Sequence, residues 1–154
     1  MFVDSDVVFT KDVDVNYFLK DGKPFLLRTR YEDMPSDHAV QNWQWITEKM
    51  IGFKSEWEYM RRLPLIYWRD TLVGITNSYP DLHTSALQEH KEFQPPRRAF
   101  TEFNFIGQFI EKFDYERYES IDTRDWLPEP IVKQFWSYSG LTEDEENEIK
   151  EILK

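Results

Sequence analysis

Short apolar segments typical of β-strands alternate with amphipathic segments typical of helices along this chain. The sequence predicts extended segments at 1–3, 7–9, 25–27 and 63–68, and helices at 36–52, 69–77 and 81–93, from 101 onward and in the tail from 142. Elements that alternate in this way bury their apolar faces against one another in layers. We therefore expect an α/β fold, organised as a single domain over residues 1–154.

Apolar and aromatic side chains are abundant enough for a conventional core. Of the 154 residues, 40% are hydrophobic and 17% are aromatic. A chain of this length removes roughly two-thirds of its unfolded surface from water when it folds. The chain has no cysteine, which excludes disulfides and Cys-ligated metal sites and permits a reducing compartment. No apolar run approaches the roughly 20 residues that cross a bilayer, so we expect a soluble, cytoplasmic protein.

The charge balance disfavours nucleic acid as a ligand. The formal net charge is −10, and the basic residues form only short doublets, Arg61-Arg62 and Arg97-Arg98. Phosphate neutralisation requires clustered Lys and Arg, and acidic residues are mixed along this chain rather than laid out in rows. We expect no nucleic-acid partner.

The clearest helix begins at Thr101. Its apolar residues recur at helical spacing and form one wide stripe: Phe103, Ile106, Phe109, Ile110 and Phe113. The helix at 36–52 has a similar stripe that includes Trp43 but not Trp45, because two tryptophans two residues apart cannot both face inward. The tail helix begins with a capping box formed by Thr142 and Glu145.

The triplet Asp4-Ser5-Asp6 is the first candidate for chemistry. Alternate residues of an extended segment point to the same side, roughly 7 Å apart, so two carboxylates can hold one hard divalent cation. A chain this acidic is expected to contain about one such match by chance, and a second match is present at Asp12-Val13-Asp14. Only the first follows a buried-strand signal, at the strand edge where α/β sheets place ligands.

The segment 2–9, Phe-Val-Asp-Ser-Asp-Val-Val-Phe, resembles the Asp-x-Asp segment of nucleotide-sugar glycosyltransferases with the GT-A fold. The rest of the chain is similar to the downstream half of one uncharacterised family of that superfamily. The similarity is carried in order by Tyr-Glu-Asp-Met-Pro at 31–35, Met-Arg-Arg-Leu-Pro-Leu-Ile-Tyr-Trp-Arg at 60–69, Phe-Thr-Glu-Phe-Asn-Phe-Ile-Gly at 100–107 and Gln-Phe-Trp-Ser at 134–137. The resemblance implies a partial GT-A-like mixed sheet with flanking helices.

The same resemblance implies a site and a reaction. Mn²⁺ or Mg²⁺ would bridge Asp4 and Asp6 to the diphosphate of a nucleotide-sugar donor, while an acceptor hydroxyl, on a carbohydrate or another molecule, attacks the sugar. If the reaction inverts configuration, Glu102 is our candidate for the general base, because it opens a helix whose positive end favours its ionised form. In a retaining reaction Glu102 would only bind the acceptor, together with Asn104.

Two further residues have both a functional and a structural interpretation. Arg69 follows an apolar segment and would contact the donor phosphates or sugar hydroxyls, or else form an ion pair at the start of a helix. Trp136 would stack against a sugar ring, or else fill the core. The sequence leaves both alternatives open for each residue.

The chain departs from the GT-A pattern in what precedes the Asp-x-Asp segment, where these enzymes have a nucleotide-binding half. A truncated reading frame, an excised fragment and a natural short form would each begin in this way. An exposed strand edge favours pairing with another copy, so we expect a homo-oligomer. Two alternatives to a glycosyltransferase remain: a non-catalytic interaction protein that kept the scaffold, and another metal-dependent carboxylate enzyme such as a phosphohydrolase.

Overall fold

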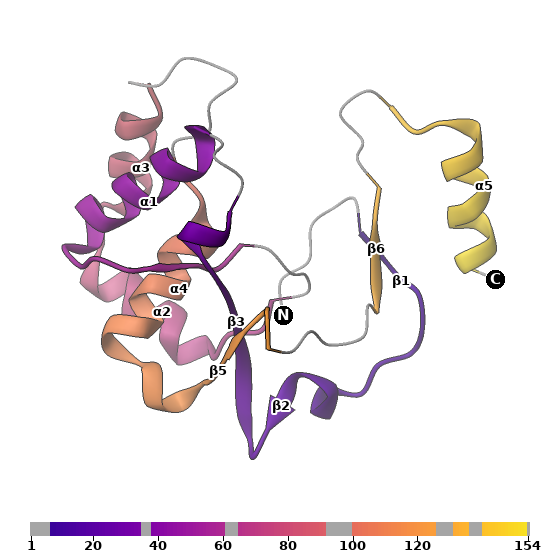
Figure 1. Cartoon of the computed structure of the whole chain (residues 1–154), viewed down its shortest axis with the longest axis horizontal. Coiled ribbons are helices and arrows are strands. Elements are labelled where there is room, and N and C mark those ends of the chain that lie inside the picture. The colour runs from indigo at the N-terminus through magenta and orange to yellow at the C-terminus, as the bar shows by residue number, and fades with distance from the viewer. Residues whose placement is uncertain are drawn as a thin grey trace.

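A computed structural model describes residues 7–34, 38–60, 65–91, 100–125, 131–135 and 140–153, and it has a mixed α/β architecture (Figure 1). Its main sheet is organised around β3 (Lys23–Arg30). β2 (Leu19–Lys20) and β4 (Trp57–Glu58) pair with β3 in antiparallel orientation, and β5 (Glu119–Asp122) pairs with it in parallel orientation. The expected mixed sheet is therefore present.

The hairpin that joins β2 to β3 turns at Asp21 and Gly22. Both residues have a positive φ, 50° and 77° respectively. An Asp-Gly pair at positive φ matches the twist of the two flanking strands, which is why this sequence favours a two-residue hairpin. The turn sets the register of β3, so that Leu26 is buried in the core.

Four helices pack with this sheet: α1 (His38–Ile51), α2 (Arg69–Ser78), α3 (Leu82–Lys91) and α4 (Glu102–Phe113). In Figure 1 they gather on one side of the view. The predicted pattern of the first helix is confirmed, because Trp43 is 9% exposed and Trp45 is 52% exposed. None of the described helices is long and apolar enough to cross a membrane.

The helix α4 is the centre of the packing. Every residue from 104 to 110 is buried, so the helix is enclosed on all sides over two turns. Gly107 permits the closest contact, because a Cβ added there would lie 2.1 Å from Cγ of Tyr59. Ile110 and Phe105 fill the core around this contact, at 0% and 1% exposure.

A second, smaller unit contains the ends of the described chain. β1 (Val7–Phe9) and β6 (Val132–Gln134) form an antiparallel two-stranded ribbon, with Val8 opposite Lys133. α5 (Glu143–Ile152) lies against β1, and the predicted capping box of Thr142 and Glu145 is present. Figure 1 shows these three elements on the side opposite α1–α4.

The structure corrects part of the predicted strand at 63–68. Leu65 forms a single bridge, and residues 66–68 have no strand structure. Trp68 is instead the N-cap of α2. The prediction also lacked the strands β2, β4, β5 and β6 and three short 3₁₀ helices, Val15–Phe18, Tyr31–Asp33 and Tyr115–Arg117. The predicted strand at 1–3 lies outside the described residues.

Candidate functional site

The structure describes three of the predicted site residues, Arg69, Glu102 and Asn104. Asp4, Asp6 and Trp136 lie outside the described residues, so their predicted roles in metal and sugar binding stay predictions. Within the described parts of the chain, no group of three or more Asp, Glu, His or Cys side chains is placed to hold a metal ion.

Glu102 is the first residue of α4, and its side chain is exposed. The hydroxyl of Thr101 caps the helix by accepting a hydrogen bond from the Asn104 N–H at 3.3 Å. The free N–H groups and the helix dipole favour a negative charge at this end. Glu102 is thus an accessible carboxylate on a firmly anchored turn.

Asn104 lies two residues further along the same turn and is completely buried, at 0% exposure. Its Oδ1 accepts a hydrogen bond from the Tyr59 N–H at 2.7 Å. That bond attaches the first turn of α4 to the segment that follows β4. The predicted contact of Asn104 with an acceptor stays a prediction, and the contact that its Oδ1 makes in the structure is with the Tyr59 backbone.

Beneath this turn lies a buried group of polar side chains, here called the β4–α4 polar cluster. Three of its members, Glu58, Asn104 and Gln108, are 0% exposed. Gln108 is on the same face of α4 as Asn104, one turn later. The cluster comprises Tyr31, Glu58, Tyr67, Asn104 and Gln108.

The tyrosines show how the charges of this cluster are arranged. Burial raises the pKa of Tyr31, the charges of Glu58 and Glu48 raise it further, and an interaction with Gln108 opposes the rise. Burial also raises the pKa of Tyr67, and the charges of Tyr118, Glu102 and Glu58 add to the effect. Tyr67 therefore lies in the field of both an exposed and an enclosed carboxylate.

A hydrogen-bonded group around Glu111 fixes the other end of α4. The carboxylate of Glu111 accepts hydrogen bonds from the hydroxyls of Ser55, at 2.5 Å, and Tyr59, at 2.7 Å. Burial raises the pKa of Tyr59, followed by the charge of Glu111 and the hydrogen bond to it. Tyr59 thus bonds α4 through its backbone N–H and through its hydroxyl, and this double attachment holds the helix in place.

The structure does not bring Arg69 to Glu102. Arg69 is exposed at the start of α2, where the Thr71 hydroxyl donates a hydrogen bond to Asp114, the C-cap of α4, at 2.5 Å. Glu102 is at the opposite end of that 12-residue helix. A helix of this length spans about 18 Å. Arg69 and Glu102 therefore lie near opposite ends of α4, and the binding role of Arg69 stays a prediction.

Sequence reasoning did not single out Glu58, Tyr67 or Gln108. The available signal was in α4, where apolar residues flank Asn104 and Gln108 on most sides of the helix. A helix that is apolar nearly all round is buried, and polar side chains within it must find polar neighbours. No comparable signal marks Glu58, since β4 is only two residues long.

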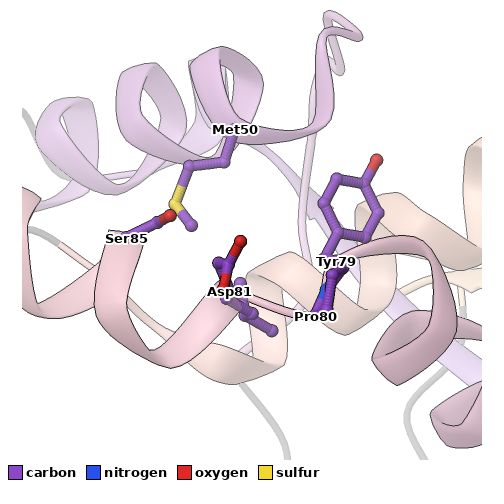
Figure 2. Close-up of a pocket in the computed structure, with 6 residues that line it drawn as sticks. Met50, Tyr79, Pro80, Asp81 and Ser85 are labelled. Carbon is purple, nitrogen blue, oxygen red and sulfur yellow. The ribbon is translucent and has the colours of Figure 1, made fainter.

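The described surface also contains an open depression of about 250 Å³ where the end of α1 meets the turn between α2 and α3 (Figure 2). Its lining includes Met50, Tyr79 and Asp81. It was not predicted, and Glu102 does not contribute to it.

Comparisons of the chain with protein-family models, with curated proteins and with solved structures found no match.

Proposed function

We propose that this chain is a glycosyltransferase-like protein that takes part in metal-dependent transfer of a sugar from a nucleotide-sugar donor to an acceptor hydroxyl. The observation that carries the proposal is the first turn of α4, where the exposed carboxylate of Glu102 is anchored by the buried Asn104. The resemblance of segments 2–9 and 100–107 to GT-A enzymes supplies the reaction class.

In the proposed reaction the bond between the anomeric carbon and the diphosphate breaks, and a bond from the acceptor oxygen to that carbon forms. The acceptor proton passes to the Glu102 carboxylate if configuration inverts. Asp4 and Asp6 would hold Mn²⁺ or Mg²⁺, which neutralises charge on the departing diphosphate. The anchored turn of α4 supports this role, because a base must be held at a fixed position to accept the proton.

Calorimetric titration with a nucleoside diphosphate, in the presence and absence of Mn²⁺, tests the proposal. We expect binding that requires both reagents and is lost in the double variant Asp4→Ala/Asp6→Ala. In Glu102→Gln, binding should persist while release of the diphosphate from a nucleotide-sugar falls by about 100-fold or more, the usual effect of removing a general base. The variant Glu116→Gln, which changes an exposed carboxylate on a different element, is the matched control.

The outcomes separate this proposal from its alternatives. A chain that binds neither reagent would favour a non-catalytic interaction protein. Hydrolysis of a simple phosphate ester, dependent on the metal and on Asp4 and Asp6, would favour a phosphohydrolase. Either result contradicts the glycosyltransferase assignment.

A further inference from the structure

The depression between α1 and the α2–α3 turn has apolar walls built on rigid elements. Met50 projects from the last turn of α1 (Figure 2). The Tyr79 ring lies edge-on to Phe105 and Phe109, with centroid distances of 5.2 and 6.2 Å, and so is fixed against the core. Leu82 is partly buried and packs against the same core. These walls fit an unbranched aliphatic chain, and the thioether of a methionine adapts well to such a chain.

The polar side of the depression is acidic. Figure 2 shows the Asp81 carboxylate directed toward Met50, and the Ser85 side chain beside the Met50 thioether. Asp81 is exposed, and among the described residues it forms no ion pair. The α1 helix ends at Ile51 and α3 begins at Leu82, so helix ends of opposite dipole sign meet here, and the acidic character of this side comes from the Asp81 carboxylate itself.

The neighbouring cations of the described chain are engaged elsewhere. Lys49 Nζ lies 2.6 Å from Glu89 Oε1, which ties α1 to α3 beside the depression. Lys112 Nζ donates to the Ile51 carbonyl oxygen at 2.8 Å. The charge of Asp81 is thus available to a cation from outside.

We propose that the depression is a docking site for one lysine side chain of a partner protein. The methylene stem would lie along Met50, Leu82 and the Tyr79 ring, and the ammonium would contact the Asp81 carboxylate and the Ser85 hydroxyl. The volume of the depression, about 250 Å³, supports one side chain. It is larger than the about 150 Å³ that accommodates benzene and smaller than the roughly 300–1,000 Å³ that drug-sized ligands require. The net charge of −10 favours approach of a basic partner. This inference does not depend on the proposed glycosyl transfer.

Methyl NMR with two probes of equal shape tests the proposal. n-Butylammonium mimics the lysine side chain, and n-butanol replaces its charge by a hydroxyl. We expect n-butylammonium to shift the Met50 methyl signal, with the Met34 methyl as an internal control, and to bind about threefold more tightly than n-butanol, the effect of one exposed ion pair. That preference should shrink at about 0.5 M salt, because salt screens the attraction between the ammonium and the carboxylate.

Two variants with the same change of charge complete the test. Asp81→Asn should abolish the preference for n-butylammonium while leaving n-butanol binding unchanged, and the remote Asp12→Asn should have no effect. Equal binding of the two probes to the unmodified protein, an equal loss in both variants, or tighter binding of n-butylguanidinium would each overturn the assignment to lysine. The folded state of each variant is verified by the unchanged Met34 signal.

Discussion

Two regions of the molecule are stabilised by internal contacts of different kinds. One is the helical body, which comprises α1–α4 and the main sheet, and the other is the ribbon region, which comprises β1, β6 and α5. In the body, seven consecutive residues of α4 are buried, from 104 to 110. In the ribbon region, no residue of α5 is buried and the two strands pair over three residues each. Regions with few buried apolar contacts open at lower free energy than the core. We therefore expect α5 to unfold locally before the body does.

Alkaline pH should produce the largest difference in stability between the two regions. Burial raises the pKa of Tyr31, Tyr59 and Tyr67, all of which lie in the body. In the unfolded chain these groups lose their protons near the ordinary value of about 10, so above that pH the folded state binds more protons. The stability is intact below this pH and then falls by up to about 1.4 kcal/mol per pH unit for each tyrosine, or about 4 kcal/mol for three.

Denaturant unfolding at pH 9 to 11, followed by circular dichroism and by tyrosinate absorbance, measures this effect. The absorbance of the three tyrosines should rise together with the loss of helical signal. Tyr67→Phe should remove the contribution of one tyrosine from the slope, up to about 1.4 kcal/mol per pH unit. If Tyr67→Phe lowered the tyrosinate signal at about pH 10 while the helices stayed intact, the buried placement of that hydroxyl would be contradicted.

A pair of glycine substitutions tests the packing of the body. Gly107→Ala places a methyl group 2.1 Å from Tyr59 Cγ, and Tyr59 is held through both its backbone and its hydroxyl. We expect a loss of about 3 kcal/mol in the free energy of unfolding, at the upper end for overpacked cores. Gly74→Ala is the control, since its methyl would meet Phe109 at 3.5 Å, an ordinary contact.

Because Gly74 lies within α2, alanine there should stabilise the protein by about 0.5–1 kcal/mol. Urea unfolding of both variants gives the two values. Similar changes at the two positions would show that α4 and Tyr59 are not in close contact at Gly107.

The helices could be predicted from the sequence because their periodicity is local. The stripe on α4 is confirmed at Ile106, Phe109 and Ile110, but Phe113 is 56% exposed, because it lies beyond the enclosed turns. β5 has the sequence Glu-Ser-Ile-Asp, whose pattern indicates no strand, and its structure depends on pairing with β3. Strand formation there is a tertiary effect, which a local pattern does not contain.

The candidate site was predictable only in part, for a related reason. The exposed position of Glu102 follows from the helix signal at Thr101, and the structure agrees with it. The burial of Asn104 depends on the Tyr59 N–H, 45 residues away, and the field at Tyr67 depends on Glu58. Contacts between distant segments decide whether a polar residue faces solvent or the interior.

The two threonine caps compare the regions directly. Thr101 caps α4 and is buried, whereas Thr142 caps α5 and is exposed. Alanine at an N-cap costs about 1 kcal/mol of helix stability. We expect Thr101→Ala to lower the global free energy of unfolding by about that amount, and Thr142→Ala to accelerate amide exchange within α5 while the global value stays unchanged. A global loss in both variants would mean that α5 and the body unfold as one unit.

The smallest expected effect concerns the ion pair between Lys133 of β6 and Glu148 of α5. Their side chains are 46% and 45% exposed, so solvent and salt screen the attraction. A double-mutant cycle with alanine at both positions should give a coupling of about 0.5 kcal/mol, measured by amide exchange in α5. The pair Lys49–Glu89 in the body is the comparison, because Glu89 is only 14% exposed and is screened less. If the ribbon pair were coupled more strongly than the body pair, the attachment of α5 would depend on charge to a greater degree than its exposure allows.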